Sequence, residues 1–141
     1  MCYRSAVDAD HIRRVVEEHI RAENEVGLDA TLATLSEQCV FDSVPRGRTF
    51  RGRDGARELY STTFQAFPDW HVELVDFTPG DDYAWAEAIV TATHLGEYEG
   101  IPPTGRQITW CMAVKFTIHA DKLGGETLYF DRLSMIEQLR A

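Results

Sequence analysis

One acidic residue interrupts an apolar stretch near the end of the chain. Asp131 lies in the run Thr127-Leu-Tyr-Phe-Asp-Arg-Leu133, whose composition is typical of a β-strand. Burying a carboxylate in such a strand costs free energy unless the group has a partner. Apolar burial also raises the pKa of a carboxyl group toward the range in which it can exchange protons with a substrate. Asp131 is therefore a candidate general acid or base; the alternative is a structural acid bonded to a backbone amide.

Two further groups could assist Asp131. Glu87 lies in an alternating stretch over 83–94 and would form a coupled carboxylate pair with Asp131 if it faced the same cavity. The alternative is a solvated strand residue. His94 ends that stretch and could donate a hydrogen bond to a substrate carbonyl or to Asp131. Equally, it could be a structural histidine that bonds the loop after it.

Large side chains along the chain could form a flat slot for a planar substrate. The residues that we expect to line it are Phe41, Tyr60, Phe64, Trp85, Tyr98, Trp110, Met112 and Tyr129. The hydroxyls of Tyr60 and Tyr129 could stabilise an enolate, and Tyr98 could act as a lid because glycines flank its loop. Any one of them could instead be an ordinary core residue.

Four arginines, at positions 46, 48, 51 and 53, gather around a turn and the start of a helix. A solvated face is the simpler interpretation of such a cluster. Placed at the mouth of a pocket, it would hold a carboxylate or a carrier phosphate.

The order of the expected elements indicates the fold class. Helical periodicity predicts helices over 8–26, 29–36 and 54–67. Alternation predicts strands over 39–44, 70–77, 83–94, 107–119 and 126–136, with a hairpin loop at 120–125. Helices followed by antiparallel strands predict an α+β fold, with helices on one face of a curved sheet. A chain of 141 residues fits a single domain, 1–141.

Composition excludes several kinds of partner. The net charge of −9 repels phosphate backbones and anionic lipid, so neither nucleic acid nor a membrane is expected to bind. The N-terminus lacks the pattern of a secretory signal, and a cytoplasmic location is expected. The three cysteines are far apart and the five histidines form no ligand motif, which predicts neither a disulfide scaffold nor a metal site.

Several motifs together resemble one known family. They are Phe-Pro-Asp-Trp at 67–70, Thr-His-Leu-Gly at 93–96, Gly-Ile-Pro-Pro-Thr-Gly-Arg at 100–106, and Asp131 with Ile-Glu-Gln-Leu at 136–139. In order and spacing these are similar to the SnoaL-like polyketide cyclases. The resemblance implies a cone-shaped fold, with a curved antiparallel or mixed sheet on N-terminal helices around an apolar pocket. It also implies a homodimer formed through the outer sheet face.

The resemblance implies a chemistry as well. In these cyclases an aspartate on the last strand serves as acid and base for an intramolecular aldol closure, without metal or cofactor. By position that residue is Asp131, and the family's histidine is His94. We therefore expect a cofactor-independent cyclase or isomerase that acts on a hydrophobic, polyketide-like carbonyl compound.

Two alternatives stay open. One is an enzyme of secondary metabolism that opens or hydrolyses an epoxide. The related epoxide hydrolases use an Arg-x-Asp pair on the long strand, and Trp85 and Glu87 stand at the corresponding positions, which disfavours that triad. The other is a domain that binds a small ligand without catalysis, since this fold hosts both kinds of protein.

Overall fold

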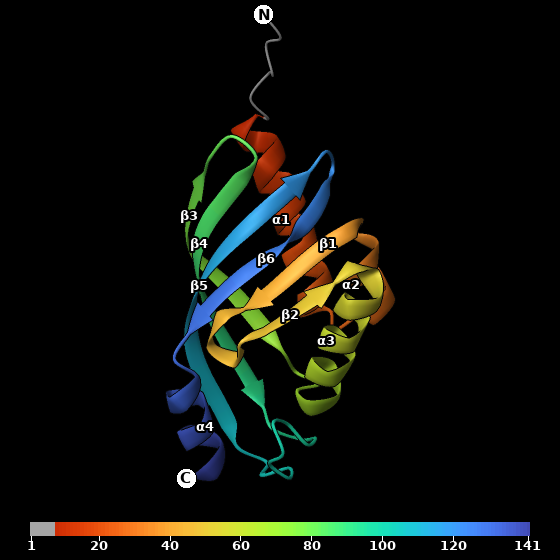
Figure 1. Ribbon diagram of the computed structural model, residues 1–141. Helices are drawn as coiled ribbons and strands as arrows, with labels where there is room; N and C mark the ends of the chain where they lie inside the picture. The colour runs from red at the N-terminus through yellow and green to blue at the C-terminus, as the bar shows by residue number, and fades with distance from the viewer. Residues whose placement is uncertain (1–7) are drawn as a thin grey trace, which may run out of the picture.

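The computed structural model describes residues 8–141, which form an α+β arrangement of helices and strands (Figure 1). The helices are α1 (Ala9–Asn24), α2 (Leu28–Ala33), α3 (Gly52–Ala66) and α4 (Arg132–Arg140), with a 3-10 turn η1 (Val44–Arg46). The strands are β1 (Leu35–Ser43), β2 (Arg48–Arg51), β3 (His71–Pro79), β4 (Tyr83–Thr93), β5 (Gln107–His119) and β6 (Lys122–Phe130).

A single mixed sheet organises the described residues. Its strand order is β2-β1-β6-β5-β4-β3, in which β1 and β6 run parallel and every other pair is antiparallel. Helices α1, α2 and α3 cover one face of the curved sheet, whereas α4 lies at one end, against β5 (Figure 1). The predicted α+β cone-shaped fold is confirmed.

Alternation along the long strands determines which side chains face the helices. In β5 the buried residues are Ile108, Trp110, Met112, Val114, Phe116 and Ile118, and in β4 they are Ala84, Ala86, Ala88, Val90 and Ala92. The apolar faces of α1 and α3 pack over this inner side of the sheet. The small side chains of β4 leave space beneath the helices, and the cavity described below occupies part of it.

The end of the chain differs from the prediction. Strand β6 begins at Lys122, inside the predicted hairpin loop, and ends at Phe130, after which the chain forms α4. Gly124 and Gly125 suggested a loop, but here they permit close packing. A Cβ at Gly125 would lie 1.8 Å from the carbonyl oxygen of Val40 in the neighbouring strand β1. Glycine is thus required because two backbones approach each other.

The start of the sheet also differs. Strand β1 begins at Leu35, four residues before the predicted start, and a short strand β2 follows where only a turn and a helix start were expected. Among the described residues, no helix has the length and apolar character needed to cross a bilayer. Cys39 is buried and Cys111 exposed, each with a free thiol; Cys2 lies outside the described residues.

Candidate functional site

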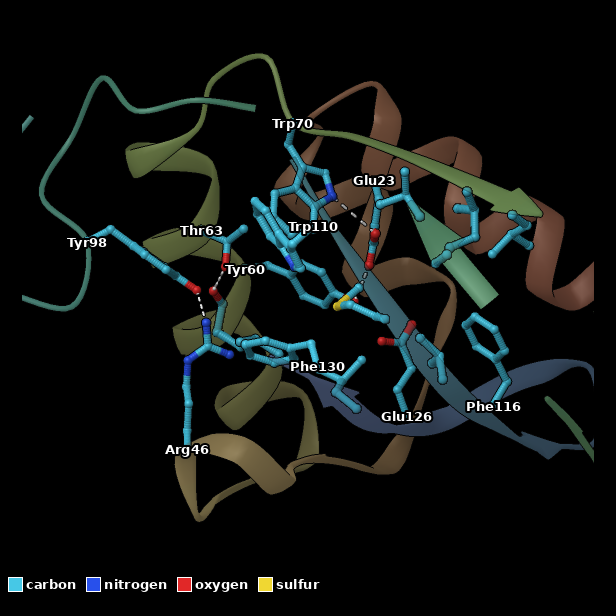
Figure 2. Close-up of a pocket in the computed structure, with 18 residues that line it drawn as sticks. Glu23, Arg46, Tyr60, Thr63, Trp70, Tyr98, Trp110, Phe116, Glu126 and Phe130 are labelled. Atoms are coloured by element: carbon cyan, nitrogen blue, oxygen red, sulfur yellow. Dashed lines mark hydrogen bonds between the residues drawn. The ribbon is translucent and has the colours of Figure 1, made fainter. Parts of the chain in front are cut away.

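A cavity lies between the inner face of the sheet and helices α1 and α3 (Figure 2). About 610 Å³ of unfilled space lies among its wall atoms and in the open solvent at its mouth. Most of its wall is apolar or aromatic, with a few polar groups at its two ends, as in many small-molecule sites. The lining residues used below are Glu23, Arg46, Tyr60, Thr63, Trp70, Tyr98, Trp110, Met112 and Glu126.

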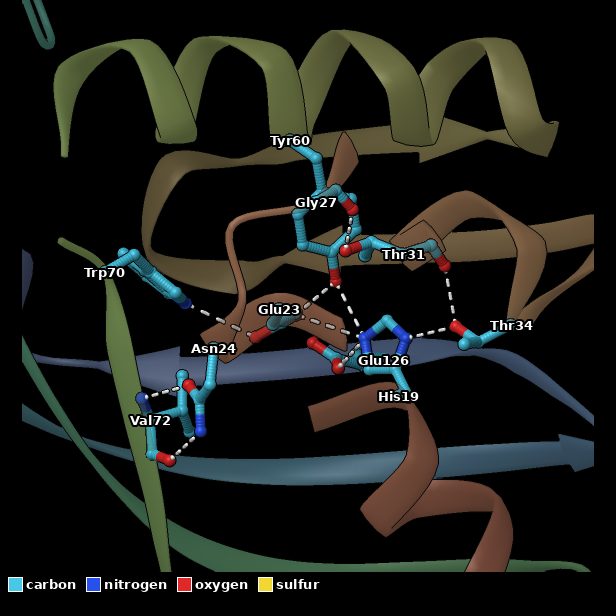
Figure 3. A network of polar contacts seen from close by, with 10 residues as sticks. All are labelled: His19, Glu23, Asn24, Gly27, Thr31, Thr34, Tyr60, Trp70, Val72 and Glu126. Carbon is cyan, nitrogen blue, oxygen red and sulfur yellow. Dashed lines mark hydrogen bonds and ion pairs between the residues drawn. The ribbon is translucent and has the colours of Figure 1, made fainter. Parts of the chain in front are cut away.

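Glu23, at the inner end of the cavity, is held by three donors. The Tyr60 hydroxyl donates to Oε1 at 2.5 Å, and Trp70 Nε1 donates to Oε2 at 3.4 Å. His19 Nε2 lies 3.1 Å from Oε1 (Figure 3). A carboxylate that accepts several hydrogen bonds is fixed in place, so Glu23 acts as a rigid anchor for the groups around it.

His19 lies behind Glu23, one helical turn earlier on the buried face of α1. The Thr34 hydroxyl donates its hydrogen to the Thr31 carbonyl at 2.6 Å. Its oxygen must therefore accept from His19 Nδ1, 2.7 Å away. Burial alone would lower the pKa of His19, but hydrogen bonds and charges from Glu126 and Glu23 outweigh it and raise the pKa to about 9. His19 is accordingly an imidazolium at neutral pH.

Glu126 completes the cluster from strand β6. It pairs in register with Phe116 of β5, and its side chain points inward with those of Leu128 and Phe130. Its contact to His19, 3.3 Å between Oε1 and Nε2, is the one polar side-chain contact recorded for Glu126 in the described part of the chain. Burial raises the pKa of Glu126, the His19 hydrogen bond lowers it, and the charge of Glu23 raises it; the net direction is upward. Glu126 is thus a buried carboxyl group with a raised pKa, which makes it a candidate for exchanging a proton with a substrate.

The same three side chains could ligate a cation. One ligand atom each from His19, Glu23 and Glu126 lies within 4.8 Å of the others. A divalent cation there would have to displace the proton from His19 Nε2, because a metal ligand must be deprotonated. The sequence did not predict this cluster, because its residues come from α1 and β6 and form no ligand motif along the chain.

Asp131, the predicted catalytic residue, lies elsewhere. It is exposed and serves as the N-cap of α4, where its side chain accepts a hydrogen bond from Ser134 N at 3.0 Å. The prediction that it lies on a buried strand is wrong because β6 ends one residue earlier. Of the alternatives for this residue, the structural acid bonded to a backbone amide matches the observed geometry.

Three more predicted site residues lie on the outer face of the sheet. Glu87 and Trp85 point outward from β4, and Tyr129 points outward from β6. Their exposed fractions are 40% for Trp85 and 44% for Tyr129. The expectation that these residues face the cavity is wrong because the inward positions of β4 hold alanines and Val90, and those of β6 hold Glu126, Leu128 and Phe130.

His94 is buried but contributes nothing to the cavity wall. The Thr104 backbone N–H donates to its Nδ1 at 3.2 Å, so the ring hydrogen is on Nε2. Burial lowers the pKa of His94. Nε2 is the one buried side-chain polar atom without a partner within the described residues. His94 therefore ties the loop over 94–106 to β4, as the structural alternative supposed.

Four of the predicted lining residues do lie in the cavity wall: Tyr60, Tyr98, Trp110 and Met112. Phe41 and Phe64 are buried just behind the wall, each with its ring centroid 5.6 Å from that of Tyr60. Sequence reasoning missed Glu23, His19, Glu126 and Trp70. A signal was present in α1, where a histidine and a glutamate four residues apart share the buried face.

The mouth of the cavity is polar and positively charged. Arg46 Nε donates to Glu99 Oε1 at 2.6 Å, and Arg132 Nε donates to Glu99 Oε2 at 2.9 Å. Arg46 also donates to the Tyr98 hydroxyl (Figure 2). Burial raises the pKa of Glu99, but the two arginines outweigh it and the net direction is downward.

Comparison with known proteins identifies relatives of this chain. The sequence profile described as SnoaL-like polyketide cyclase matches residues 11–139. No curated protein shows significant sequence similarity to it.

Solved structures share the fold. TsrD from Streptomyces laurentii is 22% identical, with a TM-score of 0.80 over 94% of this chain and 97% of that one. A candidate polyketide cyclase from Pseudomonas putida is 25% identical, with a TM-score of 0.74 over 88% and 94%. A protein with a ketosteroid isomerase-like fold from Catenulispora acidiphila, solved with trimethylamine, is 16% identical, with a TM-score of 0.75 over 89% and 92%.

Proposed function

The chain belongs to the SnoaL-like polyketide cyclase family, and from that premise we propose that it is a cofactor-independent cyclase or isomerase. The proposed substrate is a hydrophobic small molecule with more than one carbonyl group, and Glu126 is the general acid and base of the protein. The observation that supports this most is the position of Glu126. It is a buried carboxyl group with a raised pKa in the wall of an apolar cavity, beside an ordered second carboxylate.

The proposed reaction is an internal aldol closure. The Glu126 carboxylate takes a proton from the carbon next to a substrate carbonyl, and the resulting enolate attacks a second carbonyl of the same molecule. A carbon–carbon bond forms, and the new alkoxide takes the proton back from the Glu126 carboxylic acid. Atoms and charge balance within the substrate and Glu126, so the step needs no co-reactant.

The neighbours of Glu126 set its reactivity. His19 shares its charge with both carboxylates, and Glu23 is anchored by Tyr60 and Trp70. The fixed Glu23 charge disfavours ionisation of Glu126 and so makes it a stronger base once it is ionised. Trp110 and Met112 hold the substrate flat against the sheet, which contributes by orientation.

The test is proton exchange on a simple ketone. We expect the protein to accelerate replacement of the C1 protons of 2-tetralone by deuterium in D₂O, followed by proton NMR. Glu126→Gln keeps the shape and removes the base, and it should lower this rate roughly 10²- to 10⁴-fold. If the exchange rate of Glu126→Gln stays within threefold of the wild-type rate, and circular dichroism shows that the variant is folded, this would falsify the role of Glu126.

Two controls separate the alternatives. Treatment with a chelator should leave the exchange rate unchanged. If the chelator abolishes exchange and added zinc restores it, the reaction depends on a metal bound by His19, Glu23 and Glu126. Tight binding of 2-tetralone without any exchange would instead support a binding domain that has no catalytic activity.

Epoxide opening is a second candidate, favoured by the raised pKa of Glu126, which retains the acid form that would protonate an epoxide oxygen. The inward positions of β4 hold alanines and Val90, so this strand supplies no arginine and acid pair to position a water. Hydrolysis of 1,2-epoxytetralin faster than exchange on 2-tetralone would favour this candidate over the cyclase.

A further inference from the structure

The cavity has two chemically different ends. Figure 2 shows Arg46 and Tyr98 at one side of it and Glu23 and Glu126 at the other, with apolar and aromatic side chains between them. The buried acids would repel a negative group on the substrate, whereas the mouth would attract one. A substrate with an acidic end can therefore enter in one orientation only.

Arg46 keeps donors available at the mouth. A guanidinium has five N–H groups, and in the described residues three of those of Arg46 have acceptors: Glu99, the Ser43 hydroxyl and the Tyr98 hydroxyl. The cation lies 4.9 Å from the centroid of the Phe130 ring and 5.5 Å from that of Tyr98, which holds it beside the cavity. Two N–H groups remain for a ligand.

Tyr98 supplies another donor. Its hydroxyl oxygen accepts from Arg46, but across residues 8–141 no acceptor is recorded for its hydrogen. The side chain is 7% exposed and lines the cavity. Burial raises the pKa of Tyr98, so the phenol keeps its hydrogen. A buried O–H without an acceptor is costly, and an oxygen atom from a ligand would satisfy it.

Charge at the mouth also favours an anion. The groove outside the cavity is lined by Arg46, Arg48 and Arg132 and by two acids, Glu58 and Glu99. One positive charge is therefore in excess there, on a chain whose net charge is −9. Glu99 cannot neutralise both arginines that it binds.

We propose that Arg46 and Tyr98 form a subsite for a carboxylate at the end of the substrate opposite its reacting carbon. This proposal rests on the proposed function, because it concerns the same cavity. It narrows the substrate class to flat, hydrophobic carbonyl compounds that carry a free carboxylic acid. The carboxylate would take the two free Arg46 donors and the Tyr98 hydrogen.

The experiment measures binding and requires no turnover. The probes are 2-naphthoate and its neutral, nearly isosteric counterpart 2-naphthamide, titrated by isothermal calorimetry. We expect wild type to bind 2-naphthoate roughly tenfold to 100-fold more tightly than 2-naphthamide, the range of a hydrogen bond to a charged group. Arg46→Met should abolish this preference, and Tyr98→Phe should reduce it severalfold.

Matched controls isolate Arg46. Arg48→Met removes a charge from the same turn, where Arg48 pairs with Glu58 outside the cavity, and should change the preference less than threefold. Glu126→Gln should leave the preference in place, so failure of the catalytic role and failure of the subsite give different results.

Three results would overturn the subsite. They are equal affinity of wild type for the two probes, no binding of 2-naphthoate, and a preference that survives in Arg46→Met. If Arg46→Met does not fold, the wild-type comparison and Tyr98→Phe still decide the question.

Discussion

His19 is the residue whose protonation couples the cavity to stability. Its pKa of about 9 in the folded protein exceeds its ordinary value of 6.5. Folding therefore favours the imidazolium, and this stabilisation is fully present below pH 6.5 and lost as the pH rises to about 9. Compared with His19→Gln, wild type should lose on the order of 3 kcal/mol of unfolding free energy across that window. Urea denaturation of both proteins from pH 6 to 9 measures this.

A control for this linkage uses Glu126→Gln. Glu126 is one of the two carboxylates that raise the pKa of His19. In the Glu126→Gln protein, the effect of His19→Gln on the free energy of unfolding should therefore depend less on pH than it does in wild type. A stability difference between wild type and His19→Gln that stays constant or grows as the pH rises would contradict the raised pKa of His19.

Asp131 provides the contrasting test. As the N-cap of α4, it accepts a hydrogen bond that alanine cannot replace and asparagine can. Asp131→Ala should cost about 1 kcal/mol in unfolding free energy, and Asp131→Asn much less. Both variants should keep deuterium exchange on 2-tetralone within threefold of wild type. A 100-fold lower exchange rate in Asp131→Asn would instead indicate that Asp131 is the catalytic residue.

The loop over 94–106 is the element that brings Tyr98 and Glu99 to Arg46. The N–H groups of Leu95 and Gly96 both donate to the carbonyl of Ala66 at the end of α3. A Cβ at Gly96 would lie 2.4 Å from the backbone oxygen of Gln65. Gly96→Ala must push the loop off the helix, at a cost of roughly 1–3 kcal/mol.

The consequence of Gly96→Ala should extend to the mouth of the cavity. We expect a lower midpoint of thermal unfolding and a weaker preference for 2-naphthoate. Leu95→Ala, at an exposed position in the same loop, is the matched control and should change stability by about 0.5 kcal/mol or less. Equal behaviour of the two variants would mean that the loop is free to move.

Alternation and helical periodicity predicted most elements of this fold. Strand β5 was predicted at its observed bounds, and β4 to within one residue. The error at β6 had larger consequences than its size suggests. Side chains in a strand alternate between its two faces, so an error in the inward face of β4 and β6 changes every predicted lining residue. The predicted cavity lining therefore contained Trp85 and Tyr129, whereas the observed lining contains Ala88 and Glu126. The residues of the acid cluster are also distant in sequence, since His19 and Glu23 lie in α1 and Glu126 lies in β6.

At the scale of the whole molecule, the outer face of the sheet exposes large apolar side chains that nothing in residues 8–141 covers. The rings of Trp85 and Tyr129 lie 6.1 Å apart on it, across the intervening strand β5. Clustered apolar side chains on the surface of a soluble protein mark interaction sites more often than chance.

We propose that this face joins two copies of the chain, as the family resemblance implies. Wild type should then sediment at twice the chain mass of 16.0 kDa. Trp85→Asp would place a charge in the contact and should convert the dimer to monomer. Val44→Asp is the matched control, because Val44 is 45% exposed but lies in the η1 turn. Since the cavity lies on the inner side of the sheet, away from the face that carries Trp85 and Tyr129, the monomeric variant should retain exchange on 2-tetralone. A wild-type monomer, or a dimer that Trp85→Asp leaves intact, would contradict the assignment of this face.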